Sequence, residues 1–439
     1  QATVDRLQEQ ERERFQRQLD DSYLPGRRKK PDVSPGSEGK DQRCFDIKGI
    51  ALETMGKPAP GLRALLMPVL AEHESRCLSL ADIKALQREL GNRLIDHGYV
   101  SSRVLVPQQA LDSGHLQLTL VPGRIEGLAT QELDEQLLRL ALPLGPGEIL
   151  ELPAMEQAVE NLNRVQGLDA SLDIKPGEDK GRSVVMGTGR RTRWYAPALT
   201  LKRQSYGDTR HTTGNLQAEI GSPLGLTDRL TVTANTDLDT AISDEAWGMG
   251  LDYDLGVGYW LFSAGFNRQV YSNEVQGTFR SFEASGTTDV SRLEANRVLY
   301  RSGITRLTAG LLARYSEVRN LLENTTIRVS SYRLKTGGMR LDYSQRAGKW
   351  RLGSVLTWEA GSAGGPATNL RDGSSVADRQ YERTKLFLSA LRPFSFWNGS
   401  ARFQLNGQYS PDELYSSARF SLTAGVDGYE QVSFSGNTG

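Results

Sequence analysis

Residues 247–255 read WGMGLDYDL, and two kinds of residue alternate through this stretch. The odd positions hold Trp, Met, Leu, Tyr and Leu, whereas the even positions hold Gly, Gly, Asp and Asp. Successive side chains of a β-strand point to opposite faces of its sheet. The stretch therefore predicts a strand with one apolar and one polar face. A soluble β-sandwich alternates in the same way, so this pattern alone leaves two architectures open.

The same alternation recurs after Arg193, in residues 215–220 (NLQAEI), 229–238 (RLTVTANTDL), 306–315 (RLTAGLLARY) and 401–409 (ARFQLNGQY). Three features favour a transmembrane β-barrel. The strands are about 9–12 residues long, which suits a tilted membrane crossing. Aromatic residues gather near strand ends, as in GYWLF and PFSFW, like interfacial girdles. Short turns such as SPLGLTD alternate with long polar loops such as residues 360–380.

The predicted inner face carries Asp, Arg, Gln, Thr and Gly, which require water rather than a packed apolar core. We therefore expect a wide, wet lumen. Acidic residues such as Asp237 and Asp239 fit strand positions that line it.

Composition excludes several classes of function. Lysine plus arginine and aspartate plus glutamate both number 53, so no net charge points to a nucleic acid partner. No run of about 18 apolar residues indicates a membrane-spanning helix. The four histidines and two cysteines lack metal-ligand spacing. No nucleophile elbow, phosphate-binding loop or zinc-protease motif occurs, so we expect no enzymatic activity, cofactor or metal.

The first 43 residues differ from the rest of the chain. Residues 1–23 predict a helix that is polar nearly all round, which is either a frayed extension or a helix housed in a water-filled cavity. Residues 24–42, rich in proline, glycine and basic residues, predict a flexible linker. A start at Gln1 suits a mature protein whose leader has been removed.

Between the linker and the barrel, the sequence predicts two small α+β modules in tandem. In the first, residues 44–52 predict a strand, and Ser79 is a plausible N-cap for an amphipathic helix that ends at Gly98. Residues 101–107 and 115–128 predict two further strands. In the second, residues 155–166 predict a helix, residues 170–177 and 181–191 predict strands, and GTGRRT (187–192) predicts the hinge into the barrel.

The two cysteines, Cys44 and Cys77, both lie in the first module. They are either buried free thiols or a disulfide, and an oxidising compartment favours the disulfide.

Several stretches make the chain similar to a known family. Residues 94–128, with GYVSSR, LVP and LVPGRIEGL, and residues 162–185 resemble the paired POTRA domains of two-partner secretion (TpsB) transporters. These belong to the outer-membrane BamA/TpsB superfamily and include FhaC, ShlB and CdiB. Residues 221–230 resemble the first hairpin turn of that barrel, and residues 294–303 resemble a mid-barrel strand pair. The likeness runs through nearly the whole chain in order.

The resemblance implies an architecture. It comprises an N-terminal plug helix at 1–24, a periplasmic linker at 25–43, POTRA domains at 44–127 and 128–192, and a transmembrane antiparallel β-barrel from 193 to 439. The barrel of the family has about 16 strands, of which we count eleven or twelve, so we expect the barrel in this sequence to be C-terminally incomplete.

The resemblance also implies a function. The chain is expected to secrete a large unfolded TpsA exoprotein, such as a contact-dependent inhibition toxin, haemolysin or haemagglutinin, across the outer membrane without ATP. The alternative is a BamA-type insertase that assembles other barrels. We expect a monomer in the outer membrane of a Gram-negative bacterium, with periplasmic POTRA domains, lipid or lipopolysaccharide contacts and no nucleic acid partner.

The partner is expected to bind the first POTRA domain by adding a strand to its sheet. The candidate surface comprises Lys84, Gln87 and Arg88 on the helix, and Ser101, Arg103 and Leu105 on the strand. The apolar positions of the same helix are expected to build the domain's own core.

The last residues, 422–439, resemble the loop that folds into the lumen in this family. Val426, Gly428 and Tyr429 match its VRGY or VRGF motif, but Asp427 stands where the family has arginine. The family's arginine pairs with an acidic residue of the barrel wall, which an aspartate would repel. Asp427 is a substitution, a sign of two joined segments, or a natural variant with another anchor.

Overall fold

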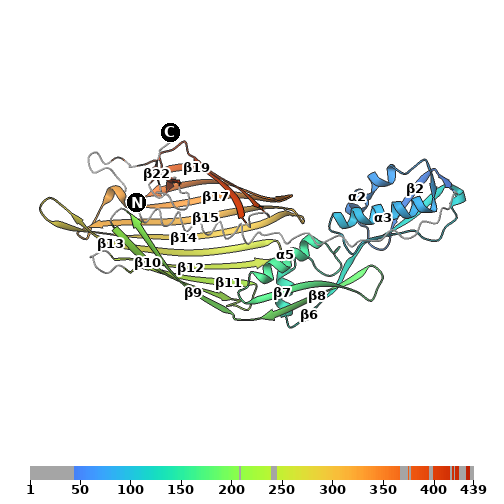
Figure 1. The fold of residues 1–439 in the computed structure, drawn as a ribbon, viewed down its shortest axis with the longest axis horizontal. Helices are drawn as coiled ribbons and strands as arrows, with labels where there is room; N and C mark the ends of the chain where they lie inside the picture. Colours follow the sequence, from blue (N-terminus) through green and yellow to red (C-terminus); the bar gives the residue numbers. More distant parts are fainter. Residues whose placement is uncertain are drawn as a thin grey trace. The chain divides into compact units, whose positions relative to one another are not determined.

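The computed structural model describes residues 44–206, 209–238, 245–365, 374, 377–394, 399–415, 418–419, 421–424 and 432–435. These residues fall into two compact units. One unit holds the two small modules, and the other holds the long strands that follow Arg193. Figure 1 shows short strands and helices in the first unit and a broad sheet in the second.

The first module folds helices against one face of a small sheet. Its elements are β1 (Cys44–Ile47), β2 (Gly49–Thr54), α2 (Pro60–Ala71), β3 (Arg76–Ser79), α3 (Leu80–Asp96), β4 (Arg103–Leu105), the 3-10 turn Leu111–Ser113 and β5 (His115–Val121). The sheet order is β2-β5-β4, with β5 parallel to β2 and antiparallel to β4. Strands β1 and β3 form a separate antiparallel pair. The stretch 44–52 is thus two strands, because the carbonyl of Gly114 accepts the N–H groups of Lys48 and Gly49 between them.

Helix α3 begins and ends where the sequence predicts. The Ser79 hydroxyl accepts a hydrogen bond from the backbone N–H of Asp82, and the Asp82 carboxylate accepts one from the backbone N–H of Ser79. This reciprocal capping box satisfies two N–H groups that the first turn would leave unpaired. Gly98 takes a positive φ of 91° just beyond the helix. Of the five residues predicted to form its apolar face, Ile83, Leu86, Leu90 and Leu94 are buried, whereas Leu80 in the first turn is exposed.

The second module repeats the pattern with β6 (Arg124–Gln131), α4 (Glu135–Ala141), α5 (Leu152–Asn163), β7 (Leu168–Pro176) and β8 (Arg182–Arg191). Its sheet order is β6-β8-β7, with β6 and β8 parallel. The predicted strand 115–128 is therefore two strands in different sheets, separated at Pro122 and Gly123.

The prediction that residues 187–192 form a hinge is wrong for most of the stretch, because Gly187 to Arg191 lie within β8 and pair with β7. The glycines have a packing role instead. A Cβ atom at Gly187 or Gly189 would lie 2.9 or 2.8 Å from Leu133 side-chain atoms. Glycine lets Leu133 close the module's core over the strand.

The second unit is dominated by a twelve-stranded antiparallel sheet. Each long strand pairs with its sequence neighbours. The strands are β9 (Tyr195–Tyr206), β10 (Thr209–Gly221), β11 (Asp228–Asp237), β12 (Glu245–Val257), β13 (Trp260–Gln276), β14 (Ser281–Arg301), β15 (Thr305–Leu322), β16 (Thr325–Thr326), β17 (Tyr332–Ala347), β18 (Trp350–Gly364), β19 (Gln380–Phe394) and β20 (Gly399–Tyr409). A short hairpin, β21 (Ser421–Ala424) with β22 (Val432–Ser435), follows.

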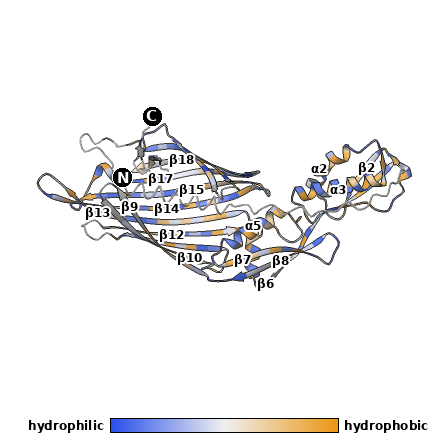
Figure 2. Cartoon of the chain, in the orientation of Figure 1, coloured by the Kyte–Doolittle hydropathy of each residue, from blue (hydrophilic) through white to orange (hydrophobic). Residues whose placement is uncertain are grey.

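The predicted alternation holds along these strands (Figure 2). The apolar set of residues 247–255 shares a face with exposed Leu293, Leu311 and Met339, as the strand registers require. We call this the outer face. Asp252, Asp254 and their counterparts occupy the opposite, inner face. Asp237 also lies at an inner-face position, as predicted, whereas Asp239 lies outside the described residues.

In the part of the chain that the structure describes, no helix has the length and apolar character needed to span a membrane.

The predicted arrangement, two small α+β modules followed by a large antiparallel sheet, is confirmed. Several strands are longer than expected, and β14 reaches 21 residues. Residues 221–230 hold the second connection of the sheet rather than its first, because β9 and β10 already form a hairpin. The plug helix at 1–24, the linker at 25–43 and the motif residues Val426, Asp427, Gly428 and Tyr429 lie outside the described residues. The number of 16 strands stays a prediction.

Candidate functional site

Ion pairs cover the inner face of the sheet. Arg229 on β11 reaches Asp254 on β12 at 3.1 Å, and the Ser263 hydroxyl donates to Asp254 at 2.6 Å. On β17, Arg340 and Asp342 pair at 2.9 Å. These groups come from inner-face positions that alternate with apolar outer-face residues. The inner face is therefore polar, and these charged side chains pair with one another. Such a face can stay hydrated without exposing isolated charges.

Gly265 allows one of these ion pairs to cross a whole strand. Asp252 on β12 and Arg292 on β14 are both paired in register with Gly265 on β13, which lies between them. Their side chains form a hydrogen-bonded ion pair above this glycine. A Cβ atom at Gly265 would lie 2.6 Å from the aspartate Oδ1 and 2.8 Å from an arginine nitrogen. The missing side chain is what gives the pair its space.

The most deeply buried ion pair of the inner face joins β18 and β19. Arg383 donates through Nε to the Glu359 carboxylate at 2.5 Å, and Lys385 lies 3.3 Å from its other oxygen. The side chains of Arg383 and Glu359 are only 5% and 4% exposed. Arg383 also donates through Nη1 to the carbonyl of Ala418 at 2.6 Å. Gln408 on β20 donates to the same carbonyl. The pair therefore anchors the segment that follows β20.

Residues 410–415 and 418–419, which we call the inward segment, pack against the inner face. Leu414, Tyr415 and Ala418 are buried in an apolar cluster with Tyr332 and Tyr381, which lie at inner-face positions. The rings of Tyr332 and Tyr415 lie 4.7 Å apart. Backbone contacts fix the segment further, because the N–H of Glu382 donates to Asp412 and the Ser410 hydroxyl donates to the carbonyl of Glu382. The inner face is thus covered by the chain itself at this end of the sheet.

The second candidate site is the edge of the first module's sheet. Among the strands that the structure describes, β4 is bonded only to β5, so its other side forms an edge of the sheet. At this edge the Gln87 side chain of α3 donates to the carbonyl of Val104 at 2.9 Å. The other edge strand, β2, has a similar arrangement, because the N–H of Ile50 lies 3.5 Å from the Glu74 carboxylate. At each edge strand, one backbone group is therefore hydrogen-bonded to a side chain. A strand that paired with that edge could take the place of this side chain.

The predicted partner-binding residues fall into two groups around β4. Lys84 and Arg88 are exposed on α3, and Arg103 and Leu105 are exposed on the sheet face that the helices leave open. Gln87 is partly buried because it bonds to the edge strand. Ser101 is different, because its hydroxyl oxygen is buried against the backbone near Gly123.

Three groups in the two modules have shifted pKa values. Burial raises the pKa of the Glu151 carboxyl, and its hydrogen bond with Tyr99 opposes that shift. Burial and the same carboxylate raise the pKa of Tyr99. The Ser79 hydrogen bonds lower the pKa of Asp82.

The hydrogen bond between Tyr99 and Glu151 also joins the two modules, because Tyr99 belongs to the first module and Glu151 to the second. Their junction is extended by Arg124, which donates to the carbonyls of Lys57 and Pro58.

Cys44 and Cys77 form a disulfide, with their Cα atoms 5.4 Å apart. It ties β1 to β3, whose register places Cys77 opposite Asp46. In the part of the chain that the structure describes, His, Cys, Asp and Glu side chains form no group of three or more that could hold a metal ion.

A long antiparallel sheet with an apolar outer face and a polar inner face, preceded by two POTRA folds, defines the class of outer-membrane β-barrel proteins with POTRA domains. Residues 181–439 match the family described as haemolysin secretion/activation protein ShlB/FhaC/HecB. Residues 45–123 match the ShlB-type POTRA domain, and residues 124–176 match a further POTRA domain. The chain belongs to the ShlB/FhaC/HecB family.

Similar proteins carry transporter names. The chain is 27% identical to the outer membrane transporter CdiB of Dickeya dadantii over 84% of its length, and 26% identical to the haemolysin transporter HpmB of Proteus mirabilis over 99%. It spans 66% of the Dickeya protein, just under two thirds, and 78% of the Proteus protein.

Two solved structures share the fold. The structure of CdiB from Escherichia coli matches with a TM-score of 0.85, covering 99% of this chain and 81% of that one, at 22% identity. CdiB from Acinetobacter baumannii matches with a TM-score of 0.81 at 22% identity, covering 99% of this chain and 82% of that one.

Sequence reasoning missed two functional features. It did not identify the Glu359–Arg383 pair or the apolar cluster of the inward segment. Strand alternation could have placed both charged residues on the inner face. Nothing in the alternation indicates that residues more than thirty positions later supply the carbonyl that Arg383 binds.

Proposed function

We propose that this chain secretes a large, unfolded partner protein across the outer membrane without ATP, as a TpsB transporter. One observation carries the proposal: a sheet with an apolar outer face and an ion-paired, polar inner face follows two POTRA folds in a chain of the ShlB/FhaC/HecB family. The relatives named above as transporters support it. The chain would lie in the outer membrane with its POTRA domains in the periplasm. We assign no reaction to it.

The first step is capture of the partner at the edge of β4. A partner segment in extended form would pair with the free edge and take over the Val104 carbonyl that Gln87 holds. Main-chain hydrogen bonds of this kind give affinity whatever the side chains are. Lys84 and Arg88 on one side and Arg103 and Leu105 on the other would then contact alternate partner side chains. Ser101 would act only through packing.

The second step is passage along the inner face. An unfolded chain carries backbone N–H and C=O groups that need hydrogen-bonding partners or water. The inner-face charges described above are paired with one another, so this face would offer an exported chain water and transient polar contacts rather than an apolar surface. Folding of the partner outside would make transport effectively one-way.

Two further elements stay predictions. Residues 1–24 would form a helix that plugs the lumen at rest, with 25–43 as its linker. The inward-folding loop predicted at 422–439 overlaps the described strands β21 and β22, and its motif residues Val426, Asp427, Gly428 and Tyr429 lie between these strands in the chain. This loop would fold into the lumen. The domain bounds of 44–127 and 128–192 also stay predictions; the family matches meet at residues 123 and 124. We propose a monomer with lipid contacts and no nucleic acid partner.

Export of the protein encoded beside this chain's gene tests the proposal. The two proteins are expressed together, and the partner is measured at the cell surface and in the medium. The double variant Arg103→Glu/Leu105→Glu should reduce export at least about tenfold, because two side chains at the capture edge change. Arg63→Glu, a charge reversal at an exposed position of α2, is the matched control and should leave export unchanged. Absence of export by the unmodified chain would overturn the proposed function.

Deletion of residues 1–24 tests the plug separately. Single-channel conductance in a planar bilayer should rise, because a lumen-filling helix blocks ions. Equal conductance with and without these residues would count against the plug but not against secretion.

A further inference from the structure

Along the neighbouring strands β13, β14, β15 and β17, the outer face changes from apolar to charged. On β15 the outer positions are apolar from Leu307 to Ala313 and then become Tyr315, Glu317 and Arg319. On β13 they run from Trp260 to Phe266 and then reach Arg268. An apolar band followed by charge at the same level is expected where strands leave the hydrocarbon layer, which is about 25 Å thick for such barrels. The charged end thus lies at a membrane surface.

Loop lengths say which surface this is. The opposite ends of these strands are joined by short turns at residues 258–259, 302–304 and 348–349. Outer-membrane barrels have short periplasmic turns and longer external loops. Strand β9, the first long strand after the POTRA folds in the sequence, also begins at the short-turn end. The charged end of the outer face therefore faces the outer leaflet.

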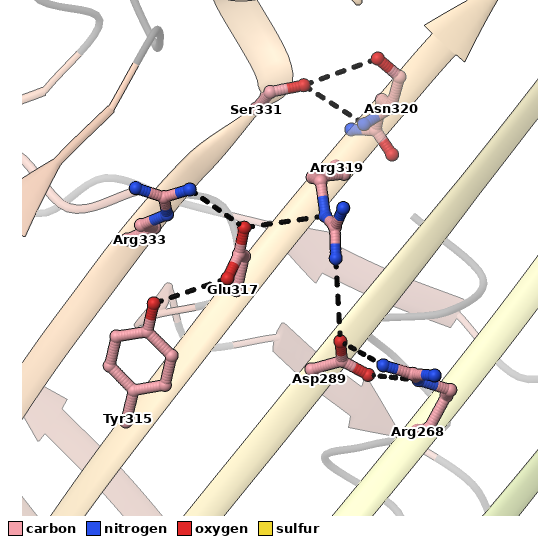
Figure 3. Close-up of polar contacts among 8 residues, drawn as sticks. All are labelled: Arg268, Asp289, Tyr315, Glu317, Arg319, Asn320, Ser331 and Arg333. Atoms are coloured by element: carbon pink, nitrogen blue, oxygen red, sulfur yellow. Dashed lines mark hydrogen bonds and ion pairs between the residues drawn. The ribbon is translucent and has the colours of Figure 1, made fainter.

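Several charged residues at this end form a connected cluster, most of which is drawn in Figure 3. Strand pairing aligns Arg268, Asp289, Glu317 and Arg333 in a single row across β13, β14, β15 and β17. Arg268 holds Asp289 through two hydrogen bonds of 2.6 and 2.8 Å. Arg333 donates to Glu317 at 3.2 Å. Arg319 bridges the two acids, with nitrogens 3.4 Å from Glu317 and 3.9 Å from Asp289. We call these residues and Lys335 the basic cluster.

The acids lie beneath the arginines. Asp289 and Glu317 are 15% and 18% exposed, whereas Arg319 and Arg333 are 56% and 59% exposed. Tyr315 donates to the second oxygen of Glu317 at 3.2 Å, so this carboxylate is engaged on both sides. Exposed Lys335 lies opposite Tyr315 in the register, one row nearer the apolar band. Within the cluster, four cations face two acids, and the guanidinium groups of Arg319 and Arg333 are held in place by the acids beneath them.

We propose that the basic cluster binds a phosphate group of lipid A, the anionic glycolipid of the outer leaflet. Arginine presents a planar fork of donors that matches phosphate oxygens, and lysine adds a point charge. Exposed Leu293, Leu311 and Met339 lie on the same face below the cluster, where acyl chains would run. This adjacency favours a lipid over free phosphate, because a soluble ion gains nothing from the apolar band. The inference rests on the outer-membrane placement in the proposed function, not on secretion itself.

Binding to the purified, delipidated full chain in detergent tests the inference. The probes are lipid A with both phosphates, lipid A with both phosphates removed and the same acyl chains, and inorganic phosphate. We expect the phosphorylated lipid to bind at least about tenfold more tightly than the dephosphorylated lipid, since charge-assisted hydrogen bonds are lost. Millimolar inorganic phosphate should not displace it. Equal binding of the two lipids, or displacement by free phosphate at that concentration, overturns the inference.

The variant Arg319→Gln/Arg333→Gln/Lys335→Gln should weaken lipid A binding at least about tenfold. The matched control is Arg392→Gln, because Arg392 is also exposed on the outer face but lies over Trp350 at the short-turn end. It should bind as the unmodified chain does. An equal loss in both variants, or in neither, contradicts the assignment to this cluster. If heat-dependent mobility in gels shows that the triple variant does not fold, Lys335→Gln alone carries the test and should weaken binding measurably. Because secretion is not measured, failure here leaves the proposed function standing.

Discussion

The inner and outer faces of the long sheet are built from the same strands, but their charged side chains differ in how far they are exposed. On the inner face, Glu359 and Arg383 are almost fully buried and hold the inward segment. On the outer face, the ion pairs of the basic cluster lie at the surface, and Arg333 stays 59% exposed while pairing with Glu317. Alternation assigns a residue to a face, but the segments that cover that face decide how much an ion pair there contributes to stability. The inner pair is covered by the chain itself.

Removal of one partner from each ion pair should give the largest contrast. Arg383→Ala removes the arginine that is hydrogen-bonded to buried Glu359 and leaves Lys385 and Arg314 as the cations near it, so the free energy of unfolding should fall by about 3–5 kcal/mol. Arg333→Ala removes an exposed partner and should cost at most about 1 kcal/mol. Urea unfolding of the full chain in lipid vesicles measures both. Conductance of Arg383→Ala should also rise, because the Ala418 carbonyl of the inward segment loses one of its two side-chain donors and keeps only Gln408.

A double variant tests whether the loss in Arg383→Ala comes from leaving a buried charge unpaired or from changing the side chain at that position. Glu359→Leu/Arg383→Leu removes both charges, so it should recover much of the stability that Arg383→Ala loses. Equal losses for Arg383→Ala and Arg333→Ala would show that the two faces do not differ in this respect.

Charge insertion at two adjacent residues of β15 should give the next largest effect. Leu311 is exposed on the outer face within the apolar band, and Leu312 lies on the inner face opposite Glu294. Leu311→Arg should lower the free energy of unfolding by about 2–4 kcal/mol, because the guanidinium would enter hydrocarbon. Leu312→Arg should cost much less, since it gains water and a nearby carboxylate.

The comparison between Leu311 and Leu312 controls for side-chain size, strand and depth. Folding into vesicles and the urea midpoint of each variant give the measurement. A larger loss for Leu312→Arg would mean that the assignment of faces is reversed on this strand.

The alternation of residues such as Trp247 and Asp252 predicted the sheet and its two faces, because a strand's side-chain period is fixed by its backbone. Ser79 and Gly98 predicted the ends of α3 through capping chemistry. Such local rules were enough for the class of fold and for most elements of the first module.

What the sequence did not disclose depends on contacts between distant residues. The break at Lys48 depends on the Gly114 carbonyl, and the role of Gly189 depends on Leu133, more than fifty positions earlier. The cover over Arg383 comes from Ala418. The candidate site was predicted as a set of exposed side chains near β4. In the structure, Gln87 is hydrogen-bonded to Val104, and the hydroxyl oxygen of Ser101 is buried. Periodicity carries no information on such partners.

Gly265 offers the finest test of how the inner face is assembled. Gly265→Ala would place a Cβ atom between Asp252 and Arg292, so the two side chains would have to separate. The pair is partly exposed, so the expected cost is about 1 kcal/mol or less. Gly337→Ala is the matched control, because Gly337 lies on the outer face with nothing within 4 Å of its Cβ position. It should be neutral or slightly stabilising in a strand. In an Arg292→Ala background the cost of Gly265→Ala should vanish, because the ion pair it disrupts is already gone. A cost that persists there would place the strain in the backbone of β13 instead of in the pair.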